Sequence, residues 1–88
     1  MKIKLSQFGT MLISRPAGRE AFLAAKAYSL SDQPHHAIEV DFSGVKVMTP
    51  SWLDEFLTPL RKEYGDKVTI VNANNPSVFA SLATISRK

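Results

Sequence analysis

The stretch that decides the fold runs from Asp41 to Leu57 and reads DFSGVKVMTPSWLDEFL. It starts at the end of an alternating run, residues 37–42, whose apolar side chains share one face, as in a half-buried strand. Those side chains are Ile38, Val40 and Phe42. Ser43 and Gly44 interrupt the strand, and from Thr49 the apolar residues recur at helical spacing. The stretch therefore predicts a strand, a tight polar turn, a crossing segment and an amphipathic helix.

The predicted helix starts at Thr49, Pro50 and Ser51. Thr49 before Pro50 fits an N-cap followed by a proline in the first helical position. Ser51 is the alternative cap, with Asp54 completing an acidic variant of the capping box. From the residues alone, capping is the favoured role of both hydroxyls, and it contributes about 1 kcal/mol. Pro59 lies inside the same helix and predicts a bend or an early end, because proline lacks the N–H that the helix needs.

The rest of the chain divides into short apolar runs separated by turn residues. Residues 1–5 alternate and carry lysines on one side, which is typical of an edge strand. Residues 11–13 are apolar and are expected to return beside them as the second strand of a hairpin. An alanine-rich helix is expected over residues 17–30, after a serine and a proline that suit a helix start. Residues 68–71 predict a buried strand, and residues 77–85 predict a closing helix.

The predicted order of elements is β-β-α-β-α-β-α, in one domain over residues 1–88. About 25 residues and a helix separate the strands that end at Phe42 and begin at Val68, so these strands should be joined by a right-handed parallel crossover. The predicted fold is α/β, bordering on α+β: a four-stranded mixed sheet with helices packed against it. Functional sites in such sheets lie beyond the carboxyl ends of the strands. Residues 43–51 and 72–76 are therefore the loops where a site is expected.

Composition and charge exclude several classes of protein. The chain has no cysteine, which excludes disulfides, thiolate nucleophiles and cysteine-based metal centres. No apolar run approaches the ~20 residues that span a bilayer, and the start lacks the apolar core of a signal peptide, so a cytoplasmic protein without a membrane partner is expected. The 11 basic and 8 acidic residues are scattered along the chain. The basic excess, a net charge of +3, suggests a nucleic-acid-associated module as a second hypothesis, which is disfavoured because nucleic-acid binders cluster their positive charge.

Candidate catalytic residues are few. His35 and His36 are adjacent, so their side chains diverge, and a solvated loop pair is favoured over a metal site. The carboxylates that could form an acid–base pair are Glu39 with Asp41, and Asp54 with Glu55. No histidine or cysteine supports either pair, and the chain lacks the glycine-rich phosphate-binding and serine-nucleophile motifs. We expect no enzymatic activity, no cofactor and no metal.

A third hypothesis is a small-ligand or nucleotide-binding module. It would use the polar loop that carries Asn72, Asn74 and Asn75. Asparagines at such positions are more often turn formers, because their side chains hydrogen-bond the nearby backbone.

Four motifs resemble the pattern of STAS domains, the anti-sigma-factor-antagonist fold. They are Asp41–Val45, Thr49–Ser51, Asp54–Leu57 and Val68–Asn72. The resemblance is closest to a short STAS-like family of unknown function, covers nearly the whole chain and is strongest over residues 37–75. It implies a non-enzymatic signalling domain.

In the well-studied antagonists of this fold, the second serine of an Asp-Ser-Ser-Gly motif is phosphorylated by its partner, a GHKL-type (histidine-kinase-like) ATP-binding protein. The resemblance places that serine at Ser51, and the phosphorylation candidates are Ser51 and Thr49. The chain departs from the motif at Thr49, Pro50 and Trp52, which replace the acidic residue, the first serine and the glycine.

The leading hypothesis is a protein-interaction module that docks its partner through residues 43–52 and the helix that follows. The expected contact residues are Asp41, Ser43, Gly44, Pro50, Trp52, Asp54 and Glu55. Trp52 has two interpretations, an exposed docking aromatic or a core residue, and the sequence favours neither. The sequence does not indicate the oligomeric state.

Overall fold

Three helices and five short strands make up the part of the chain that the computed structural model describes, residues 1–28 and 37–86. The strands are β1 (Lys2–Lys4), β2 (Met11–Leu12), β3 (Ile38–Asp41), β4 (Val47–Met48) and β5 (Val68–Val71). The helices are α1 (Arg15–Tyr28), α2 (Pro50–Tyr64) and α3 (Pro76–Ile85), with single 3-10 turns η1 (Leu5–Phe8) and η2 (Gly65–Lys67). The predicted alternation of strands and helices is confirmed, and β4 is an additional strand.

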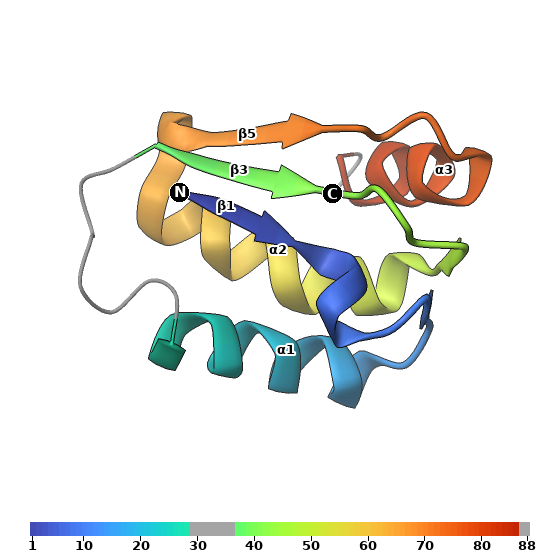
Figure 1. Ribbon diagram of the computed structural model, residues 1–88, viewed down its shortest axis with the longest axis horizontal. Coiled ribbons are helices and arrows are strands. Elements are labelled where there is room, and N and C mark those ends of the chain that lie inside the picture. Colours follow the sequence, from blue (N-terminus) through green and yellow to red (C-terminus); the bar gives the residue numbers. More distant parts are fainter. Residues whose placement is uncertain (29–36, 87–88) are drawn as a thin grey trace.

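The main sheet has three strands in the order β1-β3-β5, and all its pairs are parallel (Figure 1). The central strand is β3, which follows residues 29–36; these lie outside the described residues, as do His35 and His36. The parallel pairing of β3 with β5 confirms the parallel crossover expected between Phe42 and Val68. Because β5 lies at the edge and its side chains are half-buried or exposed, the expectation of a buried strand over residues 68–71 is wrong.

The predicted four-stranded mixed sheet and its hairpin are also wrong. Residues 11–13 do not return beside β1; β2 instead pairs in parallel with β4, and together they form a separate two-stranded sheet. Two physical reasons account for the difference. The chain after β1 winds into η1 rather than the tight turn that a hairpin needs. In addition, residues 47–48, expected only to cross the sheet edge, provide another strand with which β2 pairs.

The main sheet is apolar on one face and polar on the other. Ile3, Val40 and Ile70 lie in register across the three strands, and Ile3 and Val40 are fully buried. On the other face the register places Lys2 beside Glu39 and Glu39 beside Thr69, and all three are exposed. The apolar face packs on a core to which α2 contributes most, and the polar face is left to water.

Helix α2 continues through Pro59 to Tyr64, so the predicted early end is not found. Its buried apolar stripe lies on both sides of Pro59 and holds the helix in spite of the missing N–H: Trp52, Leu53, Phe56, Leu57 and Leu60. Helix α1 packs against α2 where Gly18 approaches the backbone of Trp52. A Cβ at residue 18 would lie 2.4 Å from the Trp52 carbonyl oxygen, so only glycine permits this approach.

None of the helices within residues 1–28 and 37–86 has both the length and the apolar character needed to cross a membrane. The same residues bring together no group of three or more histidine, aspartate or glutamate side chains that could hold a metal ion.

Candidate functional site

The two loops expected to form a site meet at Asp41, the last residue of β3. Its side chain is buried, and its Oδ1 accepts hydrogen bonds from the Asn72 side-chain amide (2.8 Å) and the Ser43 backbone N–H (2.9 Å). The Lys2 ammonium lies 3.3 Å from Oδ2. The Asn72 hydrogen bond, followed by that of Ser43, holds the pKa of Asp41 well below its usual range. Asp41 therefore ties the end of β3 to the residue that follows β5.

Asn75 makes the second connection between these loops. Its Oδ1 accepts from the backbone N–H groups of Ser77 (2.8 Å) and Val78 (3.4 Å), so Asn75 is the N-cap of α3. Its Nδ2 donates to the carbonyl oxygens of Val45 and Lys46, both at 3.1 Å. The amide groups of Asn72 and Asn75 are thus used within the fold. Asn74, the remaining asparagine of the candidate ligand loop, is exposed.

Two serines of α3, which the sequence analysis did not single out, complete the outer edge of β4. The Ser77 hydroxyl accepts from the Met48 N–H (2.7 Å) and lies 2.9 Å from the Met48 carbonyl oxygen. The Ser81 hydroxyl lies 3.2 Å from that same oxygen and 2.9 Å from the Ser77 carbonyl oxygen. The signal that could have found these serines is their spacing of four residues, which places them on one face of the helix.

The start of α2 is capped by Thr49, which confirms the first of the two predicted caps. The Thr49 hydroxyl accepts from the Trp52 N–H at 3.4 Å and donates to the Ile13 carbonyl oxygen at 2.7 Å. Ser51 is the second residue of the helix and is half-buried. Its hydroxyl forms no hydrogen bond within the described part of the chain. Of the two phosphorylation candidates, Thr49 is therefore occupied by the fold and Ser51 is not.

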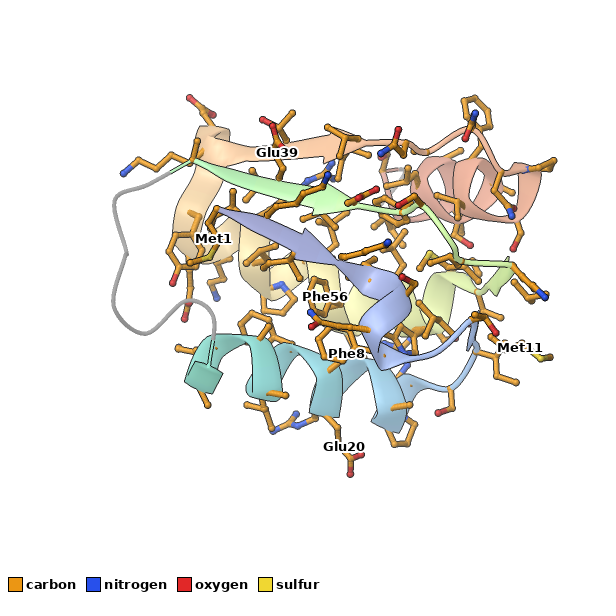
Figure 2. The ribbon with its side chains drawn as sticks, in the orientation of Figure 1. Met1, Phe8, Met11, Glu20, Glu39 and Phe56 are labelled. Atoms are coloured by element: carbon orange, nitrogen blue, oxygen red, sulfur yellow. The ribbon has the colours of Figure 1, made fainter. Side chains whose placement is uncertain are left out.

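Trp52 belongs to the core, and its interpretation as an exposed docking aromatic is wrong. Its side chain is 1% exposed and stacks on Phe56, with ring centroids 5.4 Å apart and an interplanar angle of 15°. Phe8 of η1 packs on both rings, and Figure 2 shows Phe8 and Phe56 pointing toward one another. Trp52 is one helical turn before Phe56, so it extends the apolar stripe of α2.

The turn between β3 and β4 depends on Gly44. Its φ is +85°, in the left-handed region, and a Cβ there would lie 3.0 Å from the Cβ of Ser6. Glycine therefore serves both the turn and the close approach of η1. Ser43, beside it, is half-buried and donates its backbone N–H to Asp41.

Exposed apolar side chains gather on β2 and β4, beside the start of α2. Met11 is 63% exposed, Ile13 50% and Val47 40%. Met11 and Val47 are register partners, and Figure 2 shows the Met11 side chain pointing away from the body of the protein. We call Met11, Ile13 and Val47 the β2–β4 patch. The hydrogen bond from Thr49 to Ile13 places this patch directly against the α2 start.

Asp54 and Glu55 tie α2 to α1. Arg15 Nη1 lies 3.2 Å from Asp54 Oδ2 and 2.9 Å from Glu55 Oε2, and Thr58 donates to Asp54 Oδ1 at 2.6 Å. The hydrogen bond to Asp54, followed by that to Glu55, raises the pKa of Arg15 above its ordinary value. Arg15 is the first residue of α1, so this contact clamps that end of α1 onto α2.

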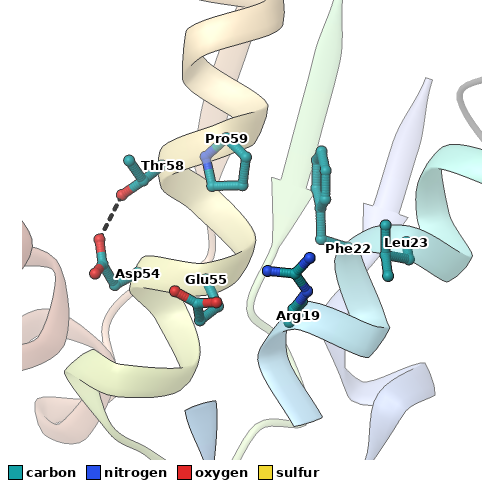
Figure 3. Close-up of a pocket in the computed structure, with 7 residues that line it drawn as sticks. All are labelled: Arg19, Phe22, Leu23, Asp54, Glu55, Thr58 and Pro59. Atoms are coloured by element: carbon teal, nitrogen blue, oxygen red, sulfur yellow. Dashed lines mark hydrogen bonds between the residues drawn. The ribbon is translucent and has the colours of Figure 1, made fainter. Parts of the chain in front are cut away.

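Beside this clamp lies a groove of about 350 Å³ between the same two helices. Arg19, Phe22 and Leu23 line it from α1, and the α2 side includes Glu55, Thr58 and Pro59 (Figure 3). The groove and the loops around Asp41 are different parts of the surface, so the residues expected to contact a partner do not form one site.

The parallel α/β sheet, the polar turn after β3 and the capped start of α2 define a STAS-like domain. Residues 26–78 match the model of a family described as a STAS-like domain of unknown function. The match spans more than half of the 88 residues, and the chain belongs to this family. Neither the curated proteins nor the solved structures contain a match.

Proposed function

We propose that this domain is a non-enzymatic protein-interaction module in signalling, and that it docks a protein partner on the β2–β4 patch and the first turn of α2. The observation that carries the proposal is the exposed apolar trio of Met11, Ile13 and Val47 beside the start of α2. Apolar side chains grouped on an otherwise polar surface are typical of interaction sites. Methionine in particular adapts its shape to different partners.

Ser51 supplies a way to regulate that docking. It lies in the first turn of α2, where backbone N–H groups and the helix dipole favour a negative charge. A phosphate there adds a charge of about −2 beside the patch, which would oppose burial of the patch against a partner. The partner that the STAS resemblance implies is a GHKL-type ATP-binding protein, which would also be the kinase.

The contacts of the carboxylates support a role without catalysis. Asp41 is engaged by Lys2, Ser43 and Asn72. Asp54 and Glu55 are engaged by Arg15. Asp41, Asp54 and Glu55 thus each connect two parts of the fold.

The alternative functions have less support. The ammonium and guanidinium groups of Lys2, Arg15 and Lys26 pair with acidic side chains, which weakens their contribution to a nucleic-acid surface. The amides of Asn72 and Asn75 bind the protein itself, which weakens the ligand-loop hypothesis.

Docking is tested by measuring the affinity for a purified GHKL-type ATP-binding protein encoded beside this chain. Val47→Lys and Met11→Lys each place a charge in the patch and should weaken binding by about tenfold or more, or about 1.4 kcal/mol. Phe79→Lys is the matched control, because Phe79 is 69% exposed on α3 and is not one of the patch residues. Equal affinity of all four proteins would contradict the docking surface.

Regulation is tested with the same protein and ATP. Intact-mass measurement should show one added phosphate on the wild type and on Thr49→Ser, and none on Ser51→Ala. Ser51→Asp should bind more weakly than Ser51→Ala. Phosphate retained by Ser51→Ala would place the modification elsewhere and overturn this part of the proposal.

A further inference from the structure

The outer edge of β5 carries free strand-pairing groups. Val71 accepts from the Phe42 N–H at 3.1 Å, so Val71 and Thr69 direct their backbone groups toward β3. Backbone groups alternate along a strand, so those of Val68 and Ile70 are directed to the outer edge. The Val68 N–H is used inside η2, where it donates to the Gly65 carbonyl. The Val68 carbonyl and both backbone groups of Ile70 remain, and no other described segment runs along this edge (Figure 1).

The two edges of the main sheet differ in their protection. The β1 edge carries Lys2 and Lys4, and exposed lysines discourage another strand from pairing. The β5 edge reads Val-Thr-Ile-Val over residues 68–71, without a charge, a proline or a glycine. These four β-branched residues favour strand pairing. The β5 edge is thus open to another strand, whereas the lysines of β1 disfavour pairing at the other edge.

We propose that β5 pairs with β5 of a second copy of this chain, antiparallel and about a two-fold axis through Ile70. In this register the Ile70 N–H of each copy donates to the Ile70 carbonyl of the other, so the pairing uses the free groups of the same residue twice. Thr69 then lies opposite Val71 of the other copy, which places a β-branched residue beside another. The two three-stranded sheets become one continuous sheet.

Charge is the reason for choosing a second copy and this edge. Antiparallel pairing of β1 with itself would place Lys2 opposite Lys4, and like charges directly opposite are unfavourable. Pairing of β5 with itself sets no two charged residues opposite one another within residues 68–71. It is also closed, because each copy contributes the only edge of its main sheet, among the described residues, that carries no exposed lysine, so assembly stops at the dimer.

The paired segment is short, so the dimer should be concentration-dependent. Four residues on each side bury less area than the roughly 1,200–2,000 Å² of a stable interface. We therefore expect monomer at low concentration and dimer at high concentration in sedimentation equilibrium. This inference is independent of the proposed docking function, because it involves neither the β2–β4 patch nor Ser51.

Two changes at the β5 edge test the inference. Thr69→Lys gives β5 an exposed lysine of the kind that β1 already carries. N-methylation of Ile70 in a synthetic chain removes the outward N–H without altering a side chain. Each should raise the concentration needed for dimerisation by at least about tenfold, or about 1.4 kcal/mol. Thr84→Lys, at an exposed position of α3, is the matched control and should dimerise as the wild type does. Circular dichroism checks that the variants are folded.

The register is tested by disulfide trapping, which the cysteine-free chain allows without background. Thr69→Cys and Val71→Cys proteins, mixed and oxidised, should give a cross-linked dimer faster than either protein alone, because residues 69 and 71 lie opposite each other. A wild type that stays monomeric at every concentration overturns the inference. So does a dimer that both edge changes leave intact, or a mixture that cross-links no faster than its components.

Discussion

The carboxylate of Asp41 and the side-chain amide of Asn72 are joined by a hydrogen bond of 2.8 Å, although 31 residues separate them in the sequence. The bond connects the ends of the neighbouring parallel strands β3 and β5, at the point where each strand leaves the sheet. Asn72 has a φ of +57°, in the left-handed region, and asparagine is among the few residues that tolerate it. The backbone of Asn72 and its side chain thus serve the same turn.

Asn72→Gly separates these two contributions. Glycine adopts the left-handed conformation without strain and removes the amide donor, so the change should reduce stability through the lost hydrogen bond and through the greater freedom of glycine in the unfolded chain, which the control below shares. A lower urea midpoint with an unchanged m-value is the expected result. Asn74→Gly, at an exposed neighbouring position, is the control and should change the midpoint less. A midpoint equal to that of the wild type would mean that the Asp41–Asn72 bond adds nothing.

The lowered pKa of Asp41 predicts acid sensitivity. The unfolded chain binds a proton at Asp41 at higher pH than the folded chain does, so this contribution to stability is full above the ordinary aspartate pKa of about 3.9. It is lost as the pH falls from there toward the lowered pKa of the folded state. The free energy of unfolding, measured with urea at a series of pH values, should therefore fall less steeply with acid in Asp41→Asn than in the wild type. Parallel pH profiles of the two proteins would contradict the pKa shift.

Gly18→Ala should destabilise the protein although alanine is the better helix former. The new Cβ would lie 2.4 Å from the Trp52 carbonyl oxygen, which belongs to the backbone and cannot rotate away. Overpacking costs about 1–3 kcal/mol and outweighs the helix-propensity gain of up to about 1 kcal/mol. Thermal unfolding should give a lower midpoint for Gly18→Ala than for the wild type, and an unchanged or higher midpoint would contradict the close approach of Gly18 to Trp52.

The two hydroxyls at the start of α2 should respond differently to removal. Thr49→Ala removes the hydroxyl that accepts from the Trp52 N–H and donates to the Ile13 carbonyl oxygen, so it should lower the free energy of unfolding by about 1–2 kcal/mol. Thr49→Ser should restore most of this loss. Ser51→Ala removes no hydrogen bond within the described residues and should lie within about 0.5 kcal/mol of the wild type. Urea unfolding of the three variants checks the ranking. A loss of stability in Ser51→Ala as large as that in Thr49→Ala would contradict the assignment of Thr49 as the N-cap.

The elements near the middle of the chain could be predicted from local pattern, and the strand partners could not. The alternation of Ile38, Val40 and Phe42 and the cap at Thr49 depend on neighbouring residues alone. Pairing is a comparison between distant segments: Met11–Leu12 meets Val47–Met48, because the 3-10 turn of residues 5–8 removes the hairpin. Each of these strands is only two residues long, too short to show a period.

The candidate site shows the same division between local and distant information. The meeting of residues 43–51 with residues 72–76 follows from parallel strand order and was predicted. The fate of Trp52 was not, because its burial depends on whether Phe8 and Phe56 enclose it. The exposure of Met11 and Val47 likewise depends on a pairing that the local sequence does not encode.

The hydroxyls of Ser77 and Ser81 bond the outward backbone groups of Met48, so α3 takes the place beside β4 that another strand could occupy. Trimming the chain from its C-terminus would therefore strip the backbone of Met48 of its partners before it reached a residue of β4. Val47, the residue before Met48, is one of the three residues of the β2–β4 patch. The last helix thus sets how short this domain can become and still keep that surface in place.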